Sequence, residues 1–305
     1  MTLSPFHPDE LEAQARAGKG AAGTGIRNFM PDQHREFFAL LPYLFVATAD
    51  AAGWPLATML TGTPGFVHAP DPVTLRVDAL PDRHDPAAGA FGEGAEIGLL
   101  GLDLATRRRN RANGAIVARD AAGFALAVRQ SFGNCAKYIQ RRAVQPAPRE
   151  SGNVETLAGL DAAARGLIAQ ADTLIVASRS RPDVGAAGGP DVSHRGGRPG
   201  FVRIEGDTLA IPDFSGNRYF NTLGNFLGEP RAALLFVDFA TGDLLQLQGR
   251  ATIDWHAAPD LVEGAERRWR LDLVRGWRRR AAVPLRWSFV DYSPATLGTG
   301  VAAPA

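Results

Sequence analysis

Two polar segments of the chain have the residue types that bind anions in proteins. The first is the run Ser193-His194-Arg195-Gly196-Gly197-Arg198-Pro199-Gly200, which combines a hydroxyl, an imidazole, two guanidiniums and three glycines. Guanidinium groups and free backbone N–H groups match the oxygens of a phosphate geometrically. The run therefore predicts an anion site, and a solvated loop between two strands is the competing interpretation.

The second segment is Asp213-Phe214-Ser215-Gly216-Asn217-Arg218-Tyr219-Phe220-Asn221-Thr222, which lies where a predicted strand passes into a predicted helix. Anions bind readily at a helix N-terminus because its N–H groups are free and its end carries a partial positive charge. The alternative is an ordinary helix cap flanked by surface polar residues. The side chains expected to place donors near the first turn are Asn217, Arg218, Asn221 and Thr222.

Other polar residues give weaker signals. We expect the run Arg107-Arg108-Arg109-Asn110-Arg111 to be a solvated hairpin and Arg278-Arg279-Arg280 to be a helix end or loop. Cys135 has no evident His or Asp partner, so we expect a buried small residue there. The histidines show no metal-ligand spacing. No catalytic carboxylate pair can be identified, so no metal site and no catalytic residue are assigned.

Composition narrows the class of protein. The chain has 305 residues, 45% apolar and 21% charged, which permits a packed core and argues against intrinsic disorder. A balance of 33 basic and 32 acidic residues argues against a nucleic-acid binder. The single cysteine excludes a disulfide within the chain. We find no signal-peptide core and no apolar run of about 18 residues, so we expect a cytoplasmic protein outside the membrane.

The chain repeats itself at one offset. Pro64-Gly65-Phe66-Val67 recurs as Pro199-Gly200-Phe201-Val202, so that position 64 maps onto position 199. The pattern Leu99-Leu100-x-x-Asp103-x-Ala105-Thr106 recurs at 234–241 with the same offset, and Gly114 maps onto Gly249. Three separate landmarks with one offset predict an internal duplication into two domain-sized copies.

Each copy is predicted to begin with a short helix and to continue as strands and turns. Helices are expected at 31–41 and 161–170, the latter with Asp161 as N-cap, and each is followed by an apolar strand, at 43–48 and 174–178. In the second copy, Gly-Asp turns separate strands at 201–204, 208–211, 232–239 and 244–253, with a helix at 218–227. The pattern predicts a mainly β fold of small antiparallel barrels. The expected boundaries are an N-terminal arm at 1–30, a first copy at 31–144, a linker at 145–156, a second copy at 157–295 and a tail at 296–305.

The two copies differ where an anion would bind. At the offset of the second polar segment, the first copy has Asp82-Arg83-His84-Asp85-Pro86. Its acids would repel a phosphate. We therefore expect the second copy to hold the ligand and the first to serve as a diverged scaffold.

The polar segments resemble those of the pyridoxamine 5′-phosphate oxidase-like family of FMN-binding split barrels, in its bacterial subgroup with two barrels per chain. The resemblance rests on residues 193–202, 211–225 and 130–140 and covers roughly residues 29 to 294. It implies two tandem split β-barrels of Greek-key type, six strands in each, and FMN bound near the interface between barrels. Many relatives carry Arg-Lys where this chain has Asn217-Arg218. The residues with which true pyridoxamine phosphate oxidases bind the substrate phosphate have no match here.

The resemblance also implies a site and a function. The implied cofactor-binding residues are Ser193, His194, Arg195, Phe214, Ser215, Asn217, Arg218, Asn221 and Thr222, together with Gln130 and Ser131 from the first copy. Trp287-Ser288 is expected to approach the flavin. The implied function is that of an FMN-dependent oxidoreductase with a small-molecule substrate and possible supply of electrons by a separate reductase, as a monomer or homodimer. The alternatives are a non-catalytic flavin-binding or sensing protein, or the same barrel with deazaflavin F420 or haem, for which His194 would be the first ligand considered.

Overall fold

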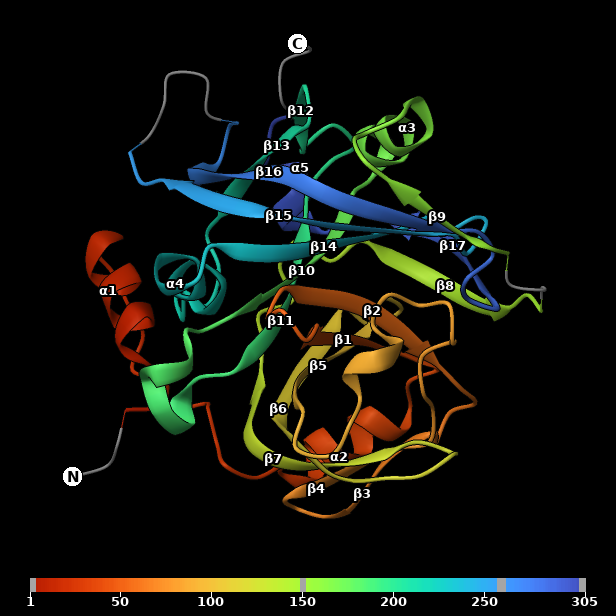
Figure 1. Ribbon diagram of the computed structural model, residues 1–305. Helices are drawn as coiled ribbons and strands as arrows, with labels where there is room; N and C mark the ends of the chain where they lie inside the picture. Colours follow the sequence, from red (N-terminus) through yellow and green to blue (C-terminus); the bar gives the residue numbers. More distant parts are fainter. Residues whose placement is uncertain (1–3, 149–151, 257–261, 302–305) are drawn as a thin grey trace.

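The computed structural model describes residues 4–148, 152–256 and 262–301. It is mainly β and is built around two large curled antiparallel sheets, one in each half of the chain, with a separate two-stranded sheet beside them (Figure 1). Each sheet wraps around its own apolar core, and the two sheets pack against each other. Both are antiparallel, and the mainly β fold expected from the sequence is confirmed.

The first unit is a seven-stranded sheet with the order β2-β1-β5-β6-β7-β4-β3. Apolar residues fill its interior, among them Phe37 and Phe38 from the short helix α2. Its elements are α2 (Asp32–Ala39), β1 (Tyr43–Ala49), β2 (Pro55–Thr61), β3 (Val67–Asp71), β4 (Thr74–Val77), the 3-10 turn η1 (Ala88–Ala90), β5 (Glu96–Asp103), β6 (Arg108–Arg119) and β7 (Phe124–Gly133).

The second unit repeats this order as β11-β10-β14-β15-β16-β13-β12. Its core is built around Trp269, Phe201 and Phe236. Its elements are α3 (Ala162–Gln170), β10 (Thr173–Arg179), the 3-10 segment η2 (Pro182–Ala187), β11 (Pro190–Gly196), β12 (Arg203–Glu205), β13 (Thr208–Phe214), α4 (Asn221–Gly228), β14 (Arg231–Val237), β15 (Leu244–Asp254) and β16 (Ala265–Arg279).

The correspondence between the units extends to strand register. The β6–β7 ladder shifts register at Asn113/Gly114, and the β15–β16 ladder shifts at Gln248/Gly249, the positions that the internal offset makes equivalent. A Cβ on either glycine would meet a backbone carbonyl oxygen, at 1.9 Å for Gly114 and 2.4 Å for Gly249. Both bulges therefore need glycine, which explains why this residue pair stands out in the sequence.

The units meet through equivalent strands. β11 lies against β5 and β6 of the first unit, and β2 lies against β14 and β15 of the second. A shared apolar cluster fills the contact, with Phe45 and Leu100 from one side and Ile175 and Leu235 from the other. This arrangement brings β6 and β11 side by side at one end of the interface, and β15 and β2 at the other.

Most of the predicted elements are confirmed, with small shifts in their ends. Asp161 caps α3 as predicted, because its side chain accepts a hydrogen bond from the Ala164 N–H at 2.8 Å. The helix predicted at 218–227 begins three residues later, at Asn221. Within the described residues the first sheet has seven strands and the second has eight, counting one that pairs with β16 at its edge, where six were expected in each barrel.

The segments outside the two units are more ordered than expected. The arm at 1–30 contains α1 (Pro8–Arg16), which packs on α4 (Figure 1). The expected linker at 145–156 includes the end of β8 (Arg141–Pro146) and most of β9 (Val154–Leu157); residues 149–151 lie outside the described part. β8 pairs with β17 (Leu285–Asp291), and α5 (Pro294–Leu297) reaches into the expected tail. No helix within the described residues is long and apolar enough to cross a membrane.

Candidate functional site

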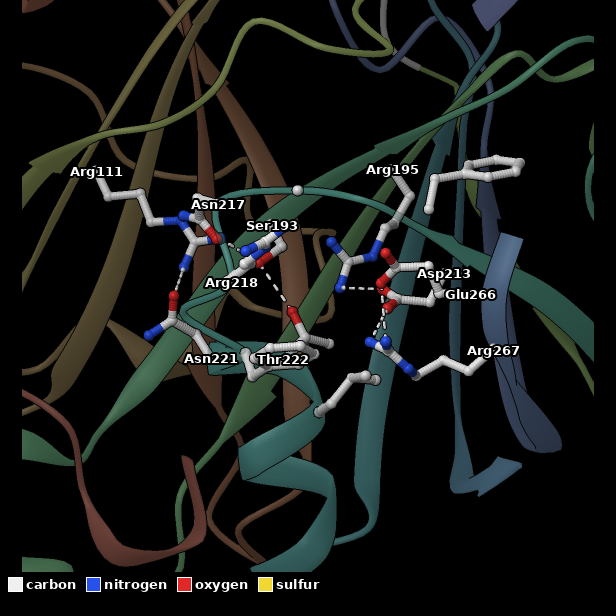
Figure 2. A pocket seen from close by; sticks show the side chains of 14 residues that line it. Arg111, Ser193, Arg195, Asp213, Asn217, Arg218, Asn221, Thr222, Glu266 and Arg267 are labelled. Atoms are coloured by element: carbon white, nitrogen blue, oxygen red, sulfur yellow. Dashed lines mark hydrogen bonds and ion pairs between the residues drawn. The ribbon is translucent and has the colours of Figure 1, made fainter. Parts of the chain in front are cut away.

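A polar pocket lies between the units at the N-terminus of α4 (Figure 2). Its empty volume is about 450 Å³, counted with the part open to solvent. Strands β6, β11, β13 and β16, the turn before α4 and the first residues of α4 supply its lining. The lining residues are Arg111, Ser193, Arg195, Asp213, Phe214, Gly216, Asn217, Arg218, Phe220, Asn221, Thr222, Leu223, Glu266 and Arg267.

The turn before α4 has an unusual backbone. Arg218 and Phe220 have φ angles of 63° and 61°, in the left-handed region that side chains other than glycine rarely adopt. Such conformations cost on the order of 1–3 kcal/mol each and are often found at functional sites. The turn places Asn217 at the mouth of the pocket, where its Nδ2 donates to Asn134 Oδ1 at 2.9 Å. Arg218 is exposed.

Arg111 connects the first unit to the pocket. Its side chain is buried and donates to Asp191 Oδ1 at 3.2 Å, to Asn221 Oδ1 at 3.3 Å and to Ser193 Oγ. Thr222 in turn donates its hydroxyl to Ser193 Oγ at 2.9 Å. The Arg111 Nε is buried with no partner among the described residues. Two hydroxyls and a guanidinium therefore converge beside the first turn of α4.

On the other side of the pocket, Asp213 lies between two arginines (Figure 2). Arg267 donates to its Oδ2 at 2.8 Å, and the Arg195 Nη2 is 3.6 Å from its Oδ1. Burial raises the pKa of the Asp213 carboxyl, against the opposing effect of the two guanidiniums. Glu266 is the second acid of the lining and pairs with Arg267 at 2.8 Å.

Charge in the pocket is predominantly positive. The lining holds four arginines against two carboxylates, and Asp191 behind the lining pairs with Arg111 at 3.2 Å, which leaves one positive charge when all of them are ionised. The N-terminus of α4 adds to this potential. The arrangement is suited to an anion.

A second cavity adjoins the first and shares Arg195, Phe214 and Gly216 with it. Its empty volume is about 380 Å³ on the same measure. None of its lining residues is a carboxylate. The residues that line it are Arg109, Lys137, Tyr138, His194, Arg195, Gly196, Pro212, Phe214 and Gly216.

Arg109, which is half-buried, and His194, which is buried, are the ionisable pair of this second cavity. Burial, together with the nearby guanidiniums of Arg111 and Arg195, lowers the pKa of Arg109 to about 9. Burial, with Arg109 as the largest charge effect, holds the pKa of His194 well below its usual value, so the imidazole is neutral. Arg109 Nη1 lies 3.4 Å from His194 Nδ1. Because a guanidinium donates, Nδ1 is the acceptor and the proton is on Nε2, which is buried with no partner in the described chain.

The second cavity also has an aromatic wall. Tyr138 stacks on Phe214, with ring centroids 5.2 Å apart and planes 30° from parallel. Tyr138 has a φ of 64°, so its backbone too is in the left-handed region. Gly196 lets the 138 segment approach, because a Cβ there would lie 2.0 Å from the Tyr138 carbonyl oxygen. A planar ring system would meet a flat apolar face here.

A buried polar network lies behind the first pocket. Glu10 of α1 accepts from the Asn221 side chain and from the His7 N–H, the latter at 3.0 Å. Burial and the nearby Asp191 raise the pKa of Glu10 to about 8. Asn225 joins the network by donating to Asp191 Oδ2 at 3.2 Å. The N-terminal helix is thus tied to the floor of the site.

Most of the predicted site residues are brought together. The first pocket contains Ser193, Arg195, Phe214, Asn217, Arg218, Asn221 and Thr222, and the second contains His194. Ser215 follows directly on β13 but lines neither cavity.

Three expectations do not fit the geometry. Gln130 donates to the Pro5 carbonyl oxygen at 3.0 Å, and Ser131 is fully buried with its hydroxyl 2.8 Å from His34 Nδ1, so neither lines the two cavities. Trp287 packs in the apolar cluster between the units, because β17 pairs with β8 away from the pocket.

The arginine run at 107–111 was wrongly expected to be a solvated hairpin. Only Arg107, with a φ of 59°, lies in a turn. The other residues of the run belong to β6, which begins at Arg108. Because successive side chains of a strand point to opposite faces, Arg109 and Arg111 share the face toward the second unit. That alternation was the available sequence signal. Arg278-Arg279-Arg280 was likewise misassigned, since β16 runs to Arg279, which is buried.

Comparisons with known proteins give only distant similarities. No protein-family model matches the chain, and no curated protein matches it. Among solved structures, HupZ of Group A Streptococcus is 15% identical, with a TM-score of 0.29 over 37% of this chain and 89% of that one. An FAD-binding protein of Mesorhizobium loti is 13% identical, with a TM-score of 0.26 over 41% and 97%. A proposed 5-nitroimidazole antibiotic resistance protein of Bacteroides thetaiotaomicron is 11% identical, with a TM-score of 0.28 over 43% and 91%. With TM-scores this low, function has to be argued from the site.

Proposed function

We propose that the chain is a flavoprotein that binds FMN between its two units and exchanges two electrons with a small-molecule substrate. The observation that supports this most is the lining of the first pocket: four guanidiniums and two hydroxyls surround it beside the N-terminus of α4, and they outnumber the carboxylates of Asp213, Glu266 and the Arg111-paired Asp191. A phosphate monoester carries about two negative charges near neutral pH and takes such donors well.

The phosphate end of FMN fits the residues present. Arg111 and Arg195 each have a buried Nε without a partner in the described chain, and Ser193 and Thr222 supply hydroxyls. Arg218 is exposed at the rim, where a cation steers an incoming anion. The Asn217 amide lacks the charge found at this position in the resembled family, which weakens the phosphate interaction without abolishing it.

The second cavity would take the ring. It adjoins the phosphate pocket through Arg195, Phe214 and Gly216, and the Tyr138–Phe214 stack offers it a flat face. FMN, when bound, supplies hydride and electron transfer. Arg109 would stabilise negative charge on a bound group, and the protonated Nε2 of neutral His194 would donate a hydrogen bond.

The proposal also includes a source of electrons, a cellular location and an oligomeric state. Electrons would come from a separate reductase or directly from a reduced nicotinamide, and the protein would act in the cytoplasm as a monomer or homodimer. Because both cavities take residues from both units, the chain has the interface that the site needs within itself.

The test is to purify the protein, record its absorption spectrum and titrate it with FMN, F420 and haem in turn. The proposal predicts saturable FMN binding and reduction of the bound flavin by NAD(P)H, alone or with a reductase. A Soret band or deazaflavin fluorescence would assign the barrel to a different cofactor. Binding without reduction or turnover would favour a sensing role, and a protein that binds no FMN would refute the proposal.

A further inference from the structure

The register of the two sheets gives the candidate site a counterpart at the other end of the interface. Thr58 on β2 occupies the strand position that Ser193 has on β11, because β2 pairs with β1 as β11 pairs with β10. Gln246 on β15 corresponds in the same way to Arg111 on β6. Each pair is separated by the offset of the internal duplication. Polar side chains of the two units therefore meet twice across the interface.

At the counterpart, a carboxylate of the chain takes the place of a ligand. Asp85 accepts hydrogen bonds from the Thr58 hydroxyl, from Gln246 Nε2 at 3.2 Å, from Arg279 Nη1 at 2.6 Å and from the Ala87 N–H at 2.8 Å. The side chains of Asp85 and Arg279 are 1% and 5% exposed. Four donors from both units thus surround one buried carboxylate, as donors surround a bound oxyanion.

The candidate site has matching donors but no carboxylate at the position of Asp85, and its Arg111 pairs instead with Asp191 at 3.2 Å. Phe220 occupies the position that corresponds to Asp85 by the same offset. Asn134 lies opposite the start of β6, and Arg279 lies opposite the start of β15. Because β6 and β15 are equivalent strands, Asn134 corresponds to Arg279. The Asn134 Nδ2 is buried with no partner among the described residues, as is the Arg111 Nε. Arg111 Nε and Asn134 Nδ2 are therefore the donors left for a ligand here.

From this comparison we infer that the counterpart, made of Thr58, Asp85, Gln246 and Arg279, is a small-oxyanion site closed by the chain's own Asp85 carboxylate. The same comparison places the anionic group of the ligand in the candidate site between Arg111, Ser193 and Asn134. Each chain then binds one ligand instead of two. The inference concerns oxyanions in general and does not depend on the ligand being FMN.

The Asp85 carboxylate stabilises the fold because its partner, Arg279, is buried. Without Asp85, the Arg279 guanidinium would be a buried cation with no counter-charge, which is strongly destabilising. With Asp85 in place, the site is neutral and filled, and an added anion would be repelled. An Asp85→Ala substitution removes a carboxyl group and leaves a space that formate matches in shape and charge.

The experiment measures thermal unfolding of Asp85→Ala against sodium formate, with sodium chloride at equal ionic strength as the reference. Asp85→Asn is the matched control, because it fills the same space without a charge and keeps the candidate site. Asp85→Ala should gain about 3 °C more than Asp85→Asn at a formate concentration ten times its Kd. A second variant, Asp85→Ala with Arg279→Met, should lose this additional gain because the cation is gone.

The inference is overturned if Asp85→Ala and Asp85→Asn respond equally to formate. If Asp85→Ala fails to fold in chloride, recovery of its native circular dichroism in formate supports the inference. Failure to recover, while Asp85→Asn folds, overturns it. Because no flavin is present, the result is separate from the test of FMN binding.

Discussion

Replacing Arg109 with methionine should strengthen the fold and weaken ligand binding at the same time. Arg109 is a cation in the second cavity whose neighbours include two further guanidiniums, and its polar contacts at His194 are with a nitrogen and a carbonyl oxygen. The charge is therefore uncompensated within the described chain. Methionine keeps much of the length of the side chain and removes the charge.

The magnitude follows from the lowered pKa of Arg109. A fall of this pKa from its ordinary value to about 9 means that the charged form is destabilised in the folded protein. The cost appears as pH falls through this interval and applies in full at neutral pH. Because the side chain is partly exposed, solvent reduces the cost to about 1–3 kcal/mol. Arg109→Met should therefore raise the melting temperature of the ligand-free protein by about 2–6 °C.

The assay pairs thermal unfolding of the ligand-free protein with FMN titration. Loss of one cation from the site should weaken FMN binding about tenfold or more, since a hydrogen bond to a charged group contributes roughly 1.5–3 kcal/mol. Arg129→Met is the control, because Arg129 is exposed and already paired with Glu96 at 2.8 Å. A lower melting temperature for Arg109→Met, or unchanged FMN affinity, would show that Arg109 is an ordinary structural residue.

Three further predictions concern the floor and the rim of the first pocket. Because the pKa of Glu10 is raised to about 8, ionisation of the unfolded chain should lower stability as pH rises from about 4.5 to 8, and urea unfolding of Glu10→Gln should show a flatter pH profile over that interval. Thr222→Val keeps the shape of the side chain but removes the hydroxyl that donates to Ser193; titration should show FMN affinity reduced about 3- to 10-fold, and an unchanged Kd would exclude this hydroxyl pair from binding. Asn217→Lys adds a cation at the rim, so FMN should bind a few-fold more tightly at low salt and the difference should shrink at high salt; a salt-independent change would contradict an electrostatic cause.

The fold was largely readable from the sequence because its signals are local. Apolar runs broken by Gly-Asp turns marked the strands, and Asp161 marked the start of α3. The late start of α4 was not readable, because it depends on the left-handed backbone of Arg218 and Phe220, which the packing of the turn imposes on residues that do not favour it.

The candidate site was readable only in the second unit, where its residues are contiguous. Arg111 reaches the pocket through a contact between strands of different units, and no local pattern states which face of β6 meets β11. Glu10 arrives from a helix at the other end of the chain. Asp85 was interpreted from the sequence as an acid that disfavours phosphate, and its pairing with Arg279 could be found only from the three-dimensional interface.

Binding of FMN should be compared with binding of riboflavin, which has the same ring and no phosphate. If the first pocket binds phosphate, isothermal titration should give one FMN per chain and at least about a hundredfold weaker binding of riboflavin, the loss expected from two charge-assisted hydrogen bonds. Equal affinities for the two compounds would mean that the arginines around the N-terminus of α4 do not recognise a phosphate, and the proposed FMN site would be wrong.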